Sequence, residues 1–235
     1  MQGALRKAIL AVLLMVAVAV LLIWARPPGV PRLTDIWPLD LEAPPGLLLD
    51  WQLQDVDADP RVCARTLAVP GMNAKPIADK PKEAGCGWHN AVHLIEADDV
   101  AIHAAVVRCG VTAALAMWLR QVVQPAAMQF LKSRVTKVSQ FGTYSCRNMR
   151  GSARLAGHRS QHATANAIDI GGFTLADGRR ISLTRDWGRP TPAGQFLAAV
   201  HEGACRYFRV VLGPSYNPAH HDHFHLDRGW WRACR

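Results

Sequence analysis

The chain has 235 residues, half of them apolar, and a formal net charge of +9 at pH 7. This length is sufficient for one main domain with a substantial core once the N-terminus is set aside. The positive charge favours anionic partners such as acidic lipid or wall polymers. The basic residues are scattered without a Lys/Arg run, which argues against a nucleic-acid-binding protein.

The N-terminus has the pattern of a membrane signal anchor. Residues 1–7 carry Arg6 and Lys7, and residues 8–24 form an unbroken apolar run. A helix of that length spans roughly 25 Å, the lower limit for crossing a membrane. No small-x-small cleavage site follows, which favours an uncleaved anchor. By the positive-inside rule residues 1–7 stay in the cytoplasm, so we expect a single-pass protein of the bacterial inner membrane with its C-terminal domain in the periplasm.

A proline-rich segment follows, and we expect residues 25–58 to form an extended linker. The folded domain is predicted to cover residues 59–235. Its first element is a short helix, because Asp59 and Pro60 fit an N-cap followed by proline at the first helical position.

Six cysteines are spread along the chain, and none belongs to the C-x2-C knuckle of a structural zinc site. We expect disulfides, which suit export to an oxidising compartment, whereas buried free thiols would suit a cytosolic protein. The sequence does not determine the pairing. A sequential pairing would join Cys63 with Cys86, Cys109 with Cys146, and Cys205 with Cys234.

The remaining elements mix strands and helices. Thr112 is the expected N-cap of a helix over residues 113–123, and Pro125 is expected to break or kink it before a second helical piece. Thr191 is expected to open another helix over residues 192–206. Strand patterns cover residues 88–95, 100–107, 134–140, 167–175, 180–183, 209–212 and 223–227. This mixture predicts an α+β fold, with a mostly antiparallel sheet flanked by helices.

Two histidine-containing stretches carry the chemistry. His162 and Asp169 stand seven positions apart in SQHATANAID, and His225 lies near the C-terminus in HHDHFHLD. Two imidazoles and a carboxylate can hold a tetrahedral Zn²⁺ and leave its fourth position open, which is the ligand set of a catalytic zinc. A zinc with all four positions filled by protein would need His220, His221 or His223 as well.

A hydrolytic zinc site also needs a base for the attacking water. His223 and His225 are two positions apart, so on a strand their side chains share a face. Asp222 alternates to the other face, although a turn or bulge at the strand entrance could aim it at the metal. Ser160 is expected to order the loop of His162 rather than to attack substrate.

The first stretch resembles the signature S-x-H-x-x-G-x-A-x-D of the LAS zinc peptidases, a family named for lysostaphin, D-alanyl-D-alanine peptidases and sonic hedgehog. Ser160, His162 and Asp169 match that pattern, and His225 matches the late third ligand. Ala165 stands where the family has glycine, which changes the expected backbone turn but removes no ligand. The resemblance implies a fold like that of the D-Ala-D-Ala peptidases.

The resemblance also implies roles for three further residues. Arg147, in YSCR, corresponds to an arginine that stabilises a developing oxyanion. Asp222, in D-x-x-H, corresponds to the acidic base of some LAS branches, and His223, in H-x-H, to the catalytic histidine of the endopeptidase branch. This sequence presents both, so either could be the base.

Residues 86–227 resemble more specifically the C-terminal family of bacterial extensin-like proteins. The resemblance is carried by CGW, ALAMWLRQVVQPAA, GTYSCR, SQHATANAIDIGGFTLADGR, ACRYF and VLGPSYNPAHHDHFHLD. We therefore expect a membrane-anchored periplasmic zinc peptidase that acts on amide bonds of peptidoglycan peptides. The alternative is a module that binds or scaffolds the cell wall without catalysis.

Overall fold

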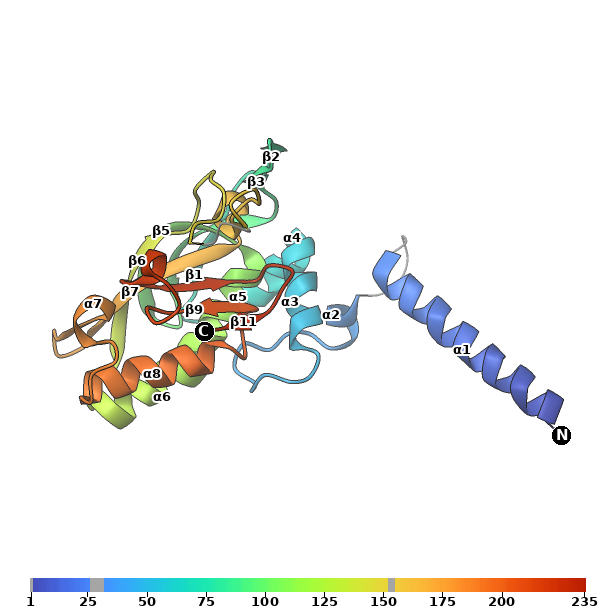
Figure 1. Ribbon diagram of the computed structural model, residues 1–235, viewed down its shortest axis with the longest axis horizontal. Coiled ribbons are helices and arrows are strands. Elements are labelled where there is room, and N and C mark those ends of the chain that lie inside the picture. The colour runs from blue at the N-terminus through green and yellow to red at the C-terminus, as the bar shows by residue number, and fades with distance from the viewer. Residues whose placement is uncertain (1, 26–31, 152–154) are drawn as a thin grey trace. The chain divides into compact units, whose positions relative to one another are not determined.

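The computed structural model describes residues 2–25, 32–151 and 155–235 (Figure 1). The chain divides into two compact units, Met1–Trp37 and Pro38–Arg235. The first contains helix α1 (Gln2–Ala25) and the short helix α2 (Leu33–Ile36). Its segment Gly3–Leu21 is long and apolar enough to cross a membrane or to serve as a signal sequence.

The second unit is built on a large sheet, which in the described part of the chain has nine strands in the order β1-β4-β5-β6-β7-β10-β9-β11, with β8 also paired to β7. Two pairs, β5 with β6 and β9 with β11, are parallel, and the other pairs are antiparallel. A small separate sheet pairs β2 with β3. The prediction of an α+β fold with a mostly antiparallel sheet is confirmed. The strand bounds are β1 Asn73–Pro76, β2 Lys80–Glu83, β3 Cys86–Trp88, β4 Ala91–Ala97, β5 Val100–Arg108, β6 Val135–Gly142, β7 Ala167–Leu175, β8 Arg180–Ser182, β9 Val210–Leu212, β10 Phe224–Asp227 and β11 Ala233–Cys234.

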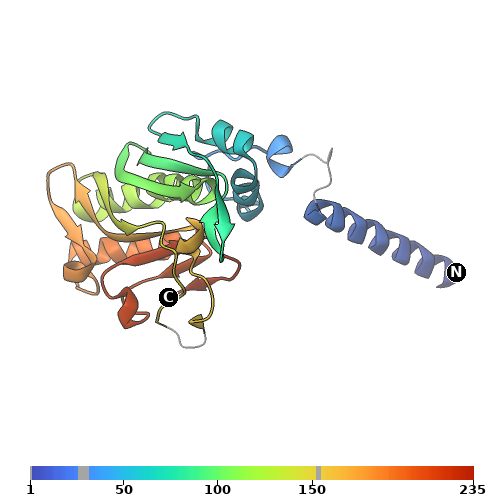
Figure 2. The same ribbon diagram turned by 90° about the horizontal axis from the view of Figure 1, so that it is seen from above.

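Two predicted helix starts are confirmed by their caps. Helix α4 (Pro60–Leu67) begins after Asp59, whose side chain accepts a hydrogen bond from the backbone N–H of Arg61. Helix α8 (Pro192–Ala204) begins after Thr191, which caps it in the same way. Helix α7 (Leu183–Asp186) follows β8 directly. Helices α6 and α8 lie side by side along one side of the second unit (Figures 1 and 2).

The long central helix starts earlier than predicted, and it continues through Pro125. Helix α5 (Cys109–Trp118) begins directly after β5, three residues before Thr112, so Thr112 is not its N-cap. The Thr112 hydroxyl instead donates to the carbonyl of Arg108. The run does not end at Pro125, which lies in α6 (Gln124–Ala126) between two π-helical segments, η1 (Leu119–Val123) and η2 (Ala127–Leu131). Widened turns of this kind accommodate a residue that lacks an N–H donor.

The predicted linker, residues 25–58, extends too far into the folded unit. Residues 49–58 form helix α3 (Leu49–Ala58), which buries Leu53 completely. The Asp50 carboxylate of this helix accepts a hydrogen bond from Arg228, near the C-terminus, at 3.1 Å. The prolines stop short of this helix, and its alternating polar residues hid the buried face.

Three disulfides join all six cysteines, and two of the three differ from the sequential pairing. Cys63 pairs with Cys109 and Cys86 with Cys146, whereas Cys205 pairs with Cys234 as predicted. The sequential order fails because α4 packs beside the start of α5, and because β3 lies next to the loop after β6. Cysteines that are neighbours in sequence are therefore not neighbours in space.

A β-bulge in β7 determines which side chains face the core. Ser139 of β6 pairs with Gly172 and the next residue, Gln140, with Ile170, so that Gly171 is left without a partner in the ladder. A Cβ at Gly171 would lie 2.2 Å from the ring of Phe141, so a larger residue there would require this exposed ring to move. Ile168 and Ile170 before the bulge, and Phe173 and Leu175 after it, all lie in the core.

Candidate metal centre

The first candidate ligand, His162, lies on a short 3-10 turn, η4 (Gln161–Thr164), just before β7. The Ser160 hydroxyl caps this turn by accepting the N–H of His162, which is the ordering role expected of Ser160. The turn ends at Ala165, whose φ of +52° lies in the left-handed region. Glycine adopts that conformation without the strain that a Cβ causes.

The other two ligand candidates are direct neighbours across a strand pair. Asp169 on β7 pairs with His225 on β10 in the antiparallel register. Ile168 and Ile170 flank Asp169 and point into the core, as do Phe224 and Leu226 around His225. Because side chains alternate along a strand, Asp169 and His225 project together from the opposite face of the sheet.

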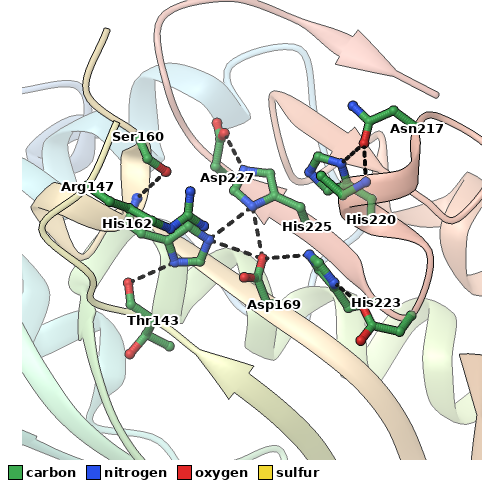
Figure 3. Close-up of polar contacts among 12 residues, drawn as sticks. Thr143, Arg147, Ser160, His162, Asp169, Asn217, His220, His223, His225 and Asp227 are labelled. Carbon is green, nitrogen blue, oxygen red and sulfur yellow. Dashed lines mark hydrogen bonds and ion pairs between the residues drawn. The ribbon is translucent and has the colours of Figure 1, made fainter. Parts of the chain in front are cut away.

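The three side chains converge on one point (Figure 3). Nε2 of His162 lies 3.1 Å from Oδ1 of Asp169 and 3.1 Å from Nδ1 of His225, and Nδ1 of His225 lies 2.9 Å from Oδ1 of Asp169. Ligand atoms around a tetrahedral Zn²⁺ lie about 3.3 Å apart, given bonds of about 2.0–2.1 Å. The observed spacing therefore fits a zinc ion after a small expansion.

The outer hydrogen bonds of both rings turn lone pairs toward that point. Nδ1 of His162 lies 3.3 Å from the carbonyl of Thr143, and Nε2 of His225 lies 2.9 Å from Oδ2 of Asp227. Both oxygens can only accept, so each of these nitrogens donates its hydrogen outward. The inward atoms are then acceptors packed against the carboxylate of Asp169, and such a cluster needs a proton or a metal cation at its centre.

The pKa shifts of the metal-free site agree with this description. Burial raises the pKa of Asp169, but hydrogen bonds from His162 and His225 outweigh it and hold the pKa well below its usual range. Burial lowers the pKa of His225, but hydrogen bonds to Asp169 and Asp227 outweigh it and raise the pKa to about 9. The two carboxylates thus favour the protonated form of His225.

His223 lies at the entrance of β10, beside the three converging side chains. Its Nε2 is 3.5 Å from Oδ1 of Asp169, and its Nδ1 is 2.8 Å from Oδ1 of Asp222. The carboxylate of Asp222 accepts the Nδ1 hydrogen, which leaves the lone pair on Nε2 facing the candidate metal centre. The structure thus places His223 in the site and Asp222 behind it, away from the pocket lining.

Arg147 lines the same pocket as Asp169, His223 and His225. Burial lowers the pKa of the Arg147 guanidinium, and the nearby charge of Asp169 opposes this shift; an arginine stays cationic at neutral pH. The preceding residue, Cys146, forms a disulfide with Cys86 of β3. This cross-link anchors the loop that carries Arg147 at its N-terminal side.

One neighbour of the site was missed from the sequence, and another was considered only as a possible fourth metal ligand. Asp227, which accepts the hydrogen of His225, lies two residues further along the same strand, and the alternation that relates His223 to His225 could have identified it. His220 also lines the pocket; burial lowers its pKa to about 4, and the charges of His225 and His223 act in the same direction. No strand pattern reaches His220, because it lies on the turn η5 (Pro218–His220).

Comparison with known proteins gives one match. The family model described as Extensin-like protein C-terminus matches residues 61–235, which cover every residue of the candidate site. No curated protein and no solved structure matches the chain.

Proposed function

We propose that this chain, which belongs to the family of extensin-like protein C-termini, is a membrane-anchored periplasmic zinc hydrolase that cleaves amide bonds in peptidoglycan peptides. We also propose that its fold is of the LAS peptidase type. One observation carries the proposal. Lone-pair atoms of His162, Asp169 and His225 converge at zinc-ligand spacing, next to a histidine that a carboxylate orients.

The reaction is the addition of one water across an amide, with the C–N bond broken to give an acid and an amine. Zinc held by His162, Asp169 and His225 would polarise the scissile carbonyl and acidify the attacking water. Nε2 of His223 takes the proton from that water and later delivers it to the leaving nitrogen.

Two further groups of the chain assist the reaction, one at the base and one at the carbonyl oxygen. The carboxylate of Asp222 holds His223 in the tautomer with a free Nε2 and stabilises the imidazolium formed when Nε2 accepts the proton. The guanidinium of Arg147 stabilises the negative charge that develops on the carbonyl oxygen. In this assignment His223 is the base, and Asp222 is its positioning residue.

Two features support the location, and a third supports the proposed partner. The helix α1 has the length and composition of a membrane span. The three disulfides suit an oxidising compartment such as the periplasm. The net charge of +9 favours an anionic wall polymer as the partner.

The test uses the full chain, purified in detergent and reconstituted with zinc, incubated with peptidoglycan and with soluble muropeptides. Mass spectrometry identifies any peptide products. We expect hydrolysis by the wild type, a loss of roughly 10²–10⁴-fold in rate for His223→Ala, and no loss for the matched control His221→Ala, whose side chain is 69% exposed. Zinc content should be equal in all three.

Unchanged peptidoglycan and muropeptides, with full zinc occupancy, would contradict the hydrolase. If the wild type sediments with peptidoglycan but releases nothing, the chain is the non-catalytic wall-binding module that its basic charge also suits.

A further inference from the structure

A further histidine, His220, faces the metal centre across the pocket. Its ring centroid lies 5.3 Å from that of His223 and 5.8 Å from that of His225. Figure 3 shows its ring on the turn η5, beside the β10 strand that carries His225. The side chain of Tyr216 packs on it, with 5.6 Å between the ring centroids. His220 therefore occupies a built position in the pocket wall.

The hydrogen bonds around Asn217 determine which nitrogen of His220 carries the hydrogen. Oδ1 of Asn217 accepts the backbone N–H of Ala219 at 3.0 Å, which identifies that atom as the amide oxygen. The same oxygen lies 2.7 Å from Nδ1 of His220. An amide oxygen only accepts, so Nδ1 donates and the lone pair of the neutral ring lies on Nε2. Within the described residues Nε2 of His220 has no hydrogen-bond partner.

The side-chain amide of Asn217 lies close to the backbone of Gly151. A Cβ on Gly151 would lie 2.6 Å from Nδ2 of Asn217, and Gly151 has a φ of +79°. Gly151 lies four residues after Arg147 on the same loop. The backbone of the Arg147 loop thus rests against the amide that orients His220.

His220 does not belong to the metal-ligand group. The ligating atoms that all lie within 4.8 Å of one another come from His162, Asp169 and His225 in the described part of the chain. A lone pair that is directed into the pocket, free of metal and of protein donors, is suited to a donor on the bound substrate.

We propose that Nε2 of His220 accepts a hydrogen bond from a backbone N–H of the substrate peptide, and that Asn217 is the positioning residue that keeps this nitrogen unprotonated. The inference rests on the proposed function and specifies the substrate as a peptide bound through an N–H next to the cleaved bond. A site built to accept an N–H discriminates against ligands that lack one, because the bound ligand then leaves the acceptor unpaired.

The test compares His220→Ala with the adjacent control His221→Ala in the full zinc-loaded chain. The probes are the free stem peptide and the corresponding disaccharide-peptide. Initial rates give kcat and KM, and calorimetry gives Kd in a His223→Ala background that blocks turnover. We expect His220→Ala to raise KM and Kd roughly tenfold for both probes, with a smaller effect on kcat and none on zinc content.

Variants of Asn217 test the positioning role. Asn217→Leu removes both accepted hydrogen bonds and should resemble His220→Ala at every pH. Asn217→Asp keeps them, but its charge favours protonation of Nε2 of His220, so its Kd should approach that of the parent only as pH rises. Gly151→Ala should also weaken binding, because it displaces Asn217.

The outcomes separate the two proposals. Equal KM and Kd for His220→Ala and the parent would overturn this inference alone. A weakened affinity for the disaccharide-peptide only would overturn it in favour of a sugar hydroxyl donor, and loss of zinc from His220→Ala would overturn it in favour of a fourth metal ligand. A chain whose binding depends on His220 but which hydrolyses nothing would contradict only the hydrolase. A chain that neither binds nor hydrolyses would contradict both.

Discussion

Asp227 accepts a hydrogen bond from Nε2 of His225 at 2.9 Å, on the side of the ring away from Asp169. The other carboxylate oxygen of Asp227 accepts the backbone N–H of Gly229 at 2.7 Å, and the side chain is 4% exposed. The carboxylate is thus fixed in place, and it directs Nδ1 of His225 toward the candidate metal centre.

This relationship predicts the effect of Asp227→Ala on zinc affinity. Carboxylates behind metal-bound histidines contribute roughly 10–100-fold to affinity, because they fix the tautomer and raise the basicity of the ring. A competition titration with a chromophoric chelator should show a loss of that size. Asp177→Asn, at an exposed turn, is the control and should bind zinc as the wild type does. Unchanged affinity in Asp227→Ala would show that Asp227 has no influence on the metal.

The raised pKa of His225, about 9 without metal, predicts pH-dependent zinc binding. Zinc must displace the proton on His225, so affinity should rise roughly tenfold per pH unit from about pH 6.5 until about pH 9. In the metal-free chain the stabilisation from protonated His225 is complete below the unfolded pKa of 6.5 and is lost as pH rises through about 9. Calorimetry in buffers of different ionisation enthalpy should detect close to one proton released per zinc at pH 7. An affinity that does not change with pH would contradict the shifted pKa.

The disulfide between Cys86 and Cys146 predicts a combined loss of stability and rate. The double change to serine removes a native cross-link and should lower the free energy of unfolding by about 2–5 kcal/mol, measured by urea denaturation. Because Cys146 precedes Arg147, kcat should fall as well. Replacing Cys205 and Cys234, which join α8 to β11, should cost stability with little effect on kcat. Equal kcat losses in the two double variants would indicate a general effect on folding.

The left-handed conformation of Ala165 predicts an almost neutral Ala165→Gly variant. Glycine relieves a strain of about 1–2 kcal/mol. It also adds about 0.5–1 kcal/mol of unfolded-chain entropy and removes a buried methyl group worth about 0.8 kcal/mol. The free energy of unfolding should therefore change by less than about 1 kcal/mol. Ala165→Val, a β-branched residue at positive φ, should be destabilised by at least about 2 kcal/mol. If valine is tolerated as well as glycine, the turn at residue 165 is not strained.

Part of the site was predictable from local rules, whereas the pairing of β7 with β10, which brings His225 to Asp169, is not visible in either strand. The spacing of His162 and Asp169 placed one residue before a strand and one on it, and strand alternation put His223 beside His225. The same rule applied two residues further would have found Asp227. The division of roles between His223 and Asp222 needed the turn before β10, which the sequence pattern does not describe.

Some of the missed features depend on contacts between distant segments, and others are local features that lack the usual sequence signal. The disulfide pairing follows from which elements pack together, and the parallel pairing of β5 with β6 is not visible in either strand. The start of α5 at Cys109 was missed because β5 runs directly into the helix, without the polar cap that marks most helix starts. The left-handed φ of Ala165 was indicated only by the glycine of the related signature.

The most direct test of this account is the zinc content of the purified, oxidised chain, measured by elemental mass spectrometry beside the double variant His162→Ala, His225→Ala. We predict one zinc per wild-type chain and none in the double variant. A wild-type chain that holds no zinc after reconstitution, or a double variant that keeps it, would contradict the assignment of His162, Asp169 and His225 as a metal centre.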